Sequence, residues 1–356
     1  MNMFEIGVRK VQAAFEAKKP NTSFLRDRYF PNVIESNHRD VLVETRRGNV
    51  IALPTVRRGD SPLSLAAVAP HEVRRYEPPF HFYEATVTAD ELDKRVFGEP
   101  IEEPYPPHER AMTLMAEKLH QGAADSLMMI QEAYASQVIK TGTITPKRML
   151  DNGDLVDAPT ISFPVDSNLV GKTLSAKWAA ATTGIMGKIA EPFLAVWKAG
   201  GKMPTDMVVG SDVLDVLFSN TEFMNYYNNR RIEAGRIEST PLQDGATHVA
   251  TLNVPKVGNI NIYTYITGYS YSKNDTDTKF IGDKSILVAC PGFGTMAYGA
   301  VYDKVGASPT LHAGQMITHA VEGDASNLFA YKGYVQSAPL PIPTTLDQYA
   351  YWTVVA

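Results

Sequence analysis

The sequence predicts a fold that mixes helices and strands, of the α+β or α/β class, and three features predict it. Apolar side chains recur every three or four positions over residues 108–140, which indicates one unusually long amphipathic helix. An apolar strand over 206–210 lies between two helical zones, 178–199 and 213–218. From residue 254 onward the chain is mainly strand-like. Helices and strands that share one chain in this way pack together as a mixed fold.

Composition and charge exclude several classes of protein. The chain has 356 residues, enough for one large domain or two modest ones, and 44% of them are hydrophobic. Its formal net charge is -5, whereas a protein that grips DNA phosphates needs a basic excess. Cys290 is the single cysteine, which excludes an intrachain disulfide and fits synthesis in a reducing cytoplasm. No apolar run reaches the roughly 18 residues that span a bilayer, and the start lacks a secretory signal.

The first 40 residues are unusual for a compact enzyme. Phe4, Val8, Val11 and Phe15 fall on one face of a short amphipathic helix, which we expect to pack on its own domain. A polar break follows, and then comes the segment Phe24-Leu25-Arg26-Asp27-Arg28-Tyr29-Phe30-Pro31. We interpret this segment as an extended arm with anchoring aromatic side chains.

Residues 41–87 look like strands joined by turns. Three pairs of adjacent arginines mark this region, at 46/47, 57/58 and 74/75. Such pairs usually solvate a surface. In a protein that assembles, their guanidinium groups can instead form bidentate pairs with carboxylates of a neighbouring subunit.

Local signals frame the long helix. Thr88-Ala89-Asp90-Glu91 matches a capping box and predicts a helix start. A proline-rich joint over 99–107 follows, and Gly142 is expected to end the long helix. With a standard rise, the helix over 108–140 is about 50 Å long. A helix of that length with one apolar stripe is suited to support a sheet.

The middle of the chain predicts shorter elements. We expect a strand over 160–165 and a helical zone over 178–199, which Pro192 either kinks or divides. Ser211 or Asp212 is expected to cap the helix that follows the strand over 206–210.

The strand-rich part of the chain predicts an alternating strand and a hairpin. Apolar and polar side chains alternate over 260–267, as in a half-buried strand. Gly282-Asp283-Lys284 predicts the turn of a hairpin over 280–289.

The sequence contains no convincing catalytic or ligand-binding motif. Gly292-Phe293-Gly294 resembles the start of a dinucleotide loop, but the third glycine and the long following helix are missing. Asp151-Asn152-Gly153-Asp154 lacks the later glutamate of a calcium loop and is better explained as a turn. The eight histidines are scattered, and Cys290 follows an apolar run that indicates burial. We therefore predict no catalytic residue, cofactor site or metal site, and favour a structural role.

Taken in order, these segments resemble those of a capsid protein family. The chain resembles the phage lambda major head protein family, called major capsid protein E, which has the HK97-like capsid fold. The likeness covers nearly the whole chain and is poorest over 141–180 and 236–256. It is carried by the arm at 24–31, the extended-loop start at 53–59, the spine helix at 109–140, the segments 282–288 and 299–303, and Gln336-Ser337-Ala338-Pro339-Leu340.

The resemblance implies an α+β organisation in five parts. They are an N-terminal arm over 1–40, an extended loop over 41–87, a peripheral domain over 88–199 with the spine helix at 108–140, an axial domain over 200–320, and a C-terminal return to the peripheral domain over 321–356.

The resemblance also implies a function and a set of interface residues. The chain is expected to be the major capsid protein of a tailed bacteriophage, assembling as hexamers and pentamers into an icosahedral shell around packaged DNA. Expected partners are copies of itself, a separate scaffolding protein, a portal and a decoration protein, with assembly in the host cytoplasm. The candidate subunit-interface residues are Phe24, Leu25, Arg26, Tyr29, Phe30, Arg46, Arg47, Arg57, Arg58, Arg74 and Arg75.

Two alternative functions stay open at this point. The first keeps the fold and makes the chain the shell of an encapsulin-type nanocompartment that holds enzymes. The second is a soluble α/β enzyme whose site the motifs do not reveal, which a deep pocket with perturbed titratable groups would indicate.

Overall fold

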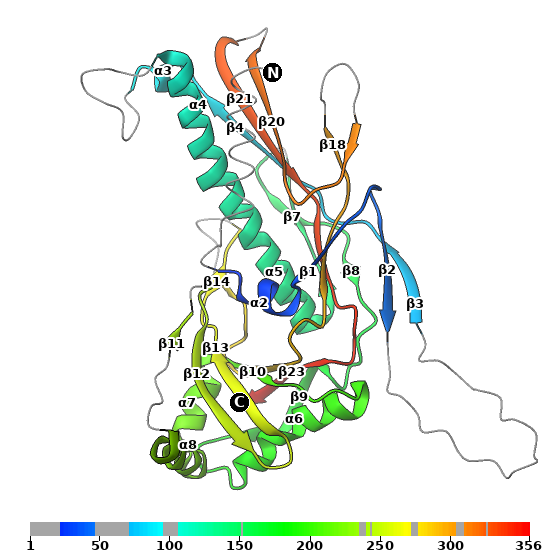
Figure 1. The fold of residues 1–356 in the computed structure, drawn as a ribbon, viewed down its shortest axis with the longest axis vertical. Helices are drawn as coiled ribbons and strands as arrows, with labels where there is room; N and C mark the ends of the chain where they lie inside the picture. The colour runs from blue at the N-terminus through cyan, green and yellow to red at the C-terminus, as the bar shows by residue number, and fades with distance from the viewer. Residues whose placement is uncertain are drawn as a thin grey trace, which may run out of the picture.

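The computed structural model describes residues 22–46, 71–94, 106–150, 152–234, 240–242, 244–271, 277–303, 310–324 and 327–356. In Figure 1 a long helix runs down much of the molecule, with β4, β20 and β21 beside its upper half. The largest sheet and its helices lie at the lower end of that helix (Figure 1). The predicted helix over 4–15 lies outside the described residues.

The long helix is built from three consecutive segments. They are α4 (Pro107–Glu117), the π-helical η1 (Lys118–Ala124) and α5 (Asp125–Thr141). Pro107 occupies the first turn, where its missing N–H removes no helical hydrogen bond. Gly142 ends the helix in the left-handed conformation, with φ 69°. The helix predicted over 108–140 is confirmed, whereas its π-helical middle was not predicted.

The largest sheet has seven strands in the order β11-β12-β13-β10-β16-β23-β9. Its strands are β9 (Val170–Trp178), β10 (Asp206–Val209), β11 (Thr240–Pro241), β12 (Thr247–Val254), β13 (Gly258–Thr264), β16 (Ser285–Ala289) and β23 (Tyr349–Val355). Every residue of the central strands β10 and β16 is buried. The helices α6 (Ile185–Gly200), α7 (Ser211–Ser219) and α8 (Thr221–Ala234) pack on this sheet, and α5 contacts its strands β9 and β23. The sheet therefore draws strands from three of the five predicted parts.

The other sheets are small. Within the described residues, two have three strands, in the orders β1-β17-β22 and β20-β21-β4, and five are pairs: β2-β3, β5-β8, β6-β7, β14-β15 and β18-β19. The strands are β1 (Asn32–Glu35), β2 (Val41–Arg46), β3 (His71–Tyr76), β4 (His81–Val87), β5 (Thr143–Ile144), β6 (Lys147–Met149), β7 (Leu155–Asp157), β8 (Ile161–Ser162), β14 (Gly268–Tyr269), β15 (Thr278–Lys279), β17 (Thr295–Tyr298), β18 (Val301–Asp303), β19 (Thr310–His312), β20 (Ile317–Asp324), β21 (Asn327–Ser337) and β22 (Pro339–Ile342). The capping box at Thr88 is present and starts the short helix α3 (Ala89–Leu92).

Two local predictions in the middle of the chain are wrong. The helical zone predicted over 178–199 begins too early, because Trp178 pairs with Val355 in the sheet and α6 starts after Gly184. Pro192 lies inside α6 and does not divide it. Neither Ser211 nor Asp212 caps α7: both lie inside the helix, and its N-cap residue is Gly210, which has no side chain to accept a hydrogen bond.

The hairpin predicted over 280–289 is also wrong. A turn does occur there, with Ser285 N–H donating to Gly282 O at 3.0 Å. However, β15 before the turn pairs with β14, and β16 after it pairs with β10 and β23. The apolar run of β16 requires burial on both faces, which only the interior of the large sheet provides.

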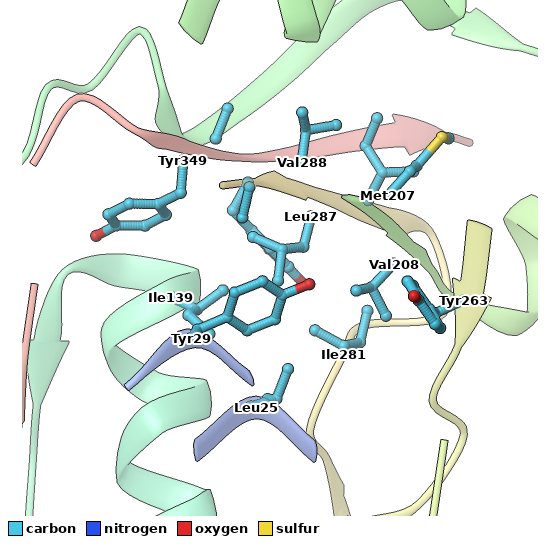
Figure 2. Packing of buried hydrophobic residues seen from close by; sticks show 14 of the residues in the cluster. Leu25, Tyr29, Ile139, Met207, Val208, Tyr263, Ile281, Leu287, Val288 and Tyr349 are labelled. Carbon is cyan, nitrogen blue, oxygen red and sulfur yellow. The ribbon is translucent and has the colours of Figure 1, made fainter. Parts of the chain in front are cut away.

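The main core lies where the large sheet, α5 and the short helix α2 (Phe24–Tyr29) meet. Figure 2 shows Leu25 and Tyr29 of α2 pointing toward Ile139 of α5 and toward β10 and β16. A second cluster joins α4 and η1 to the β20-β21-β4 sheet, through Met115, Leu119 and Val335. Because Phe24–Tyr29 form a helix, the extended arm predicted there is a wrong prediction for these residues.

Gly210 is expected to tolerate no side chain. A Cβ there would overlap the backbone carbonyl oxygens of Gly282 and Asp283, which cannot move without disturbing the turn before β16. We expect Gly210→Ala to destabilise the subunit by about 1–3 kcal/mol, the usual cost of overpacking. Thermal and urea denaturation of the purified subunit measure this change.

The control is Gly187→Ala, on the exposed side of α6, where an added Cβ meets nothing within 4 Å. It is expected to be neutral or to stabilise by about 0.5–1 kcal/mol through helix propensity. Equal stabilities of the two variants would contradict the close approach at Gly210.

Candidate assembly surfaces

Helix α2 is held at its N-terminal end by a buried carboxylate of the long helix. Glu132 of α5 is fully buried, and its two carboxylate oxygens accept the backbone N–H groups of Leu25 at 2.8 Å and Arg26 at 2.9 Å. A helix N-terminus leaves such N–H groups without helical partners, and a carboxylate there also meets the positive end of the helix dipole. Glu132 therefore joins α2 to the long helix.

The C-terminal end of α2 is held by the segment that resembled a dinucleotide loop. Gly292 N–H donates to Arg28 O at 3.0 Å, and Gly294 N–H donates to Tyr29 O at 2.9 Å. A Cβ at Gly294 would overlap the Phe30 ring, so the glycine permits this close approach. The glycines at 292 and 294 thus serve packing inside the subunit.

An ion pair joins α2 to the large sheet. The Arg28 guanidinium forms a bidentate pair with Asp206 of β10, in which Nη2 donates to Oδ1 at 3.0 Å and Nε donates to Oδ2. The guanidinium also lies 4.6 Å from the centre of the Tyr263 ring on β13. The Asp206 side chain has no exposure, so its charge depends on Arg28 for compensation.

Four of the predicted interface residues are buried inside their own subunit. Phe24, Leu25, Tyr29 and Phe30 are each 1% exposed or less. The Phe24 ring packs 5.3 Å from Tyr263, and the Phe30 ring packs 5.3 Å from Phe293. Their side chains are therefore not exposed for contact with a neighbouring subunit. The physical reason is that α2 forms part of the main core.

The predicted arginines behave differently. Arg26 lies 3.4 Å from Asp27 in its own helix. Arg75 on β3 is largely exposed and donates from Nε to Asp40 Oδ2 at 2.6 Å, which is a pair inside the subunit. Arg74 is half-buried on the same strand, and Arg46 ends β2. Arg47, Arg57 and Arg58 lie outside the described residues.

The β2-β3 pair has one covered face and one open face. Val41 and Val43 of β2 are buried, whereas Leu42 between them is 71% exposed. Val73 on β3 is 55% exposed. In the antiparallel register Leu42 lies opposite Arg75, and Glu44 lies opposite Val73. The open face therefore alternates apolar and charged side chains, which suits contact with another protein surface.

A second exposed apolar region lies beside the base of this pair. A groove of about 890 Å³ runs between residues 75–83 and the β6-β7 hairpin. Phe80 and Phe82 are both more than half exposed, and the Phe82 ring stacks on Tyr334 at 5.5 Å. Met149 at the hairpin is 67% exposed. Exposed aromatic and methionine side chains gathered in this way mark interaction surfaces.

A metal-binding cluster or a reactive thiol would indicate a chemical site. Within the part of the chain that the structure describes, no three His, Cys, Asp or Glu side chains are placed to hold a metal ion. Cys290 is buried, and burial raises the pKa of its thiol to about 11, so it stays protonated at neutral pH. None of the described helices is long and apolar enough to cross a membrane.

Solved structures share this architecture. A prophage protein of E. coli CFT073, described as a capsid protein, matches with a TM-score of 0.65 at 14% identity, covering 98% of this chain and 99% of that one. This match shows the HK97-like capsid fold. A phage-related protein of Bordetella bronchiseptica RB50 (TM-score 0.48, 10% identity, 97% of this chain and 96% of that one covered) and an encapsulin of Synechococcus elongatus PCC 7942 (TM-score 0.42, 10% identity, 91% and 85% covered) are weaker matches.

The fold is thus one that a prophage capsid protein also has. The family model of phage major capsid protein E matches residues 7–352, and the chain belongs to this family. It is a structural protein of the virion and not an enzyme. The comparison with curated proteins found no match. The resemblance stated from the sequence is therefore confirmed.

Three residues that organise the subunit were missed from the sequence. Glu132 fell among the helix-forming residues of the spine, Arg28 in an expected arm, and Asp206 at the start of an apolar strand. One signal was available. A charged residue that begins a fully apolar strand requires a partner of opposite charge when the strand is central. No local pattern in the sequence identifies Arg28, which is far away in sequence, as this partner.

The stability of the subunit is expected to depend on the ionisation of Glu132. Burial raises the pKa of its carboxyl group to about 7, from an ordinary value of 4.5, against the lowering effect of the Leu25 and Arg26 N–H groups. A carboxyl whose pKa is raised by folding stabilises most below the unfolded pKa, and this contribution is lost as the pH rises through 7. Relative to Glu132→Gln, the wild type should lose about 3 kcal/mol between pH 4 and 8.

Urea denaturation of both proteins across this pH range measures the difference in the free energy of unfolding. The glutamine keeps one acceptor for α2 and has no charge to titrate, so it isolates the ionisation. Parallel pH profiles would show that Glu132 titrates as it does in the unfolded chain.

Proposed function

We propose that the chain self-assembles as hexamers and pentamers into an icosahedral shell that encloses the packaged double-stranded DNA of a tailed phage. Membership of the major capsid protein E family over residues 7–352 is the observation that carries this proposal. The net charge of -5 agrees with a wall that encloses DNA without gripping its phosphates. Each subunit contributes modest contacts that repeat over a closed lattice.

The open face of β2-β3 and the neighbouring groove are the subunit contacts that we propose. Both expose apolar side chains beside charged ones, as at Leu42 and Arg75. The arginine pairs at 46/47, 57/58 and 74/75 would supply ion pairs to carboxylates of neighbouring subunits. Phe24, Leu25, Tyr29 and Phe30 would act indirectly, by holding α2 in place inside the subunit.

The two ends of the molecule would take different places in the shell. We assign residues 200–320, which include β10 to β13, β16, α7 and α8, to the axial domain around the symmetry axes; β9, α6 and β23 of the same sheet come from the parts predicted as peripheral, 88–199 and 321–356. The long helix with the β20-β21-β4 sheet belongs to the peripheral domain, and β2-β3 belongs to the extended loop. The first apolar cluster joins the large sheet to the lower part of the long helix and to β2-β3, and the second joins the upper part of the helix to the β20-β21-β4 sheet.

Further partners follow from this role. A separate scaffolding protein would guide closure, a portal would occupy one vertex, and a decoration protein is a further candidate partner. Assembly would take place in the host cytoplasm, which agrees with a single buried cysteine.

Replacement of the open apolar face should prevent assembly without unfolding the subunit. We expect Leu42→Asp with Val73→Asp to abolish shells, tubes and capsomer rings, because two charges would be buried in a contact between subunits. Negative-stain electron microscopy of the protein, alone and with a candidate scaffold, reads the result.

Ser167→Asp, at an exposed turn, is the matched control and should assemble as the wild type does. Circular dichroism confirms that all three proteins are folded. Shells formed by the double variant would exclude this face from the subunit contacts. A wild type that stays a small uniform particle under every condition would overturn the proposed function itself.

A further inference from the structure

Strand β1 is the exposed edge of a small sheet whose other two strands are buried. All residues of β1 are exposed, whereas every residue of β17 and β22 is buried. Among the strands that the structure describes, β1 pairs with β17 alone, in parallel. Val33 is 44% exposed and Ile34 is 47% exposed, and successive side chains of a strand point to opposite faces. Both faces of β1 are therefore open to solvent.

The outer edge of β1 carries backbone groups that can pair with another strand. Ser36 N–H donates to Tyr298 O on β17 at 2.9 Å, and the backbone groups of successive residues in a strand point alternately to its two sides. The N–H and C=O groups of Ile34 therefore also point to β17, whereas those of Val33 and Glu35 point away from it. Proteins usually protect such an edge with lysine, proline or a bulge. Strand β1 contains neither lysine nor proline, and its register with β17 is unbroken.

An antiparallel second copy of β1 fits this edge best in one register. With Ile34 on the two-fold axis, Val33 of one copy lies opposite Glu35 of the other, so each outward N–H meets an outward carbonyl oxygen of the second copy. An axis at Val33 would bring Glu35 opposite Pro31, which has no N–H to donate. An axis at Glu35 would place two carboxylates directly opposite each other, which is destabilising. The edge is therefore complementary to itself about Ile34, as a symmetric contact between two copies requires.

We propose that two copies of the chain join edge to edge through β1, antiparallel, with their Ile34 residues side by side on a two-fold axis. The pairing continues the β1-β17-β22 sheet of one subunit into that of the other. Val33 packs on the aliphatic part of the opposite Glu35, and the two Ile34 side chains pack together on the other face. Because β1 is short, each contact is weak and gains strength by repetition. The inference rests on the proposed self-assembly and names one pair of surfaces that meet in it.

Disulfide trapping of Ile34→Cys in the full-length chain tests the pairing. Opposite residues that are not hydrogen-bonded to each other have Cα atoms about 4.5 Å apart, which a disulfide can span. One substitution therefore supplies both thiols, and Cys290, which is 1% exposed, does not compete. Under mild oxidation of the concentrated protein, we expect linked dimers to form about tenfold faster than from a mismatched position, because pairing raises the local concentration of the thiols.

Val33→Cys is the matched control. Its position has almost the same exposure, but in the proposed register the two Val33 residues are two positions out of step. Their Cα atoms would lie about 8–9 Å apart, which is too far for a disulfide. Thermal denaturation confirms that both reduced variants are folded as the wild type is. Equal rates of dimer formation for the two variants would overturn the pairing.

Val33→Pro, added to Ile34→Cys, distinguishes backbone pairing from side-chain contact alone. Proline removes an N–H that points away from β17, so the subunit should keep the melting temperature of the Ile34→Cys protein. The rate of dimer formation should fall to that of Val33→Cys, because the edge of β1 can no longer pair. An unchanged rate would show that the two copies do not meet through their backbone groups, and the proposal would be wrong.

Electron microscopy of the same samples distinguishes failure of this contact from failure of the proposed function. Dimers trapped at Ile34→Cys in a protein that never forms shells or rings would support the contact and reject the proposed shell. Shells in which Ile34→Cys and Val33→Cys cross-link at equal rates would reject the contact and leave the proposed shell intact.

Discussion

The rest of the structure depends on the way in which six residues of α2 are bound between the long helix and the large sheet. Glu132 accepts the N–H groups at one end of α2, and Gly292 and Gly294 donate to the carbonyl groups at the other. The pair between Arg28 and Asp206 joins α2 to the central strand β10. These polar contacts come from three parts of the chain that are distant in sequence, so the interaction requires long-range packing.

This arrangement separates what is internal from what is available to neighbours. The aromatic side chains of α2 are buried in the main core, so they are not exposed for contact with other subunits. Leu42, Val73, Phe80 and Phe82 are exposed, all within or next to the β2-β3 pair, and are the apolar contacts that we propose. Because α2 is fixed, the direction in which the chain leaves it on either side is fixed too. The start of β1 and the exit at Thr22 are thereby set by the same few hydrogen bonds.

The long helix, the buried strand β10 and the capping box at Thr88 could be predicted because each has a local pattern of spacing or chemistry. The helix over 178–199 was placed too early because Trp178 is apolar in either state, and only its pairing with Val355 decides. The hairpin predicted over 280–289 does not form, because β16 pairs with β10 and β23, which are far away in the sequence. For the candidate surfaces, the sequence identified aromatic and arginine residues but not their burial. Phe24 and Tyr29 look the same in an exposed arm as in a core, since burial is a property of the packed subunit.

Native-state hydrogen exchange of the Leu25 and Arg26 amides tests most directly whether α2 is an integral part of the folded subunit. If Glu132 and the Arg28–Asp206 pair bind α2 as described, these two amides should exchange only on global unfolding, as slowly as those of the buried strands β10 and β16. Exchange that is many times faster than in β10, at a denaturant concentration where the subunit is native, would show that α2 opens separately. The long helix and the large sheet would then be joined by other contacts, and the burial of the α2 aromatic side chains would be a transient state.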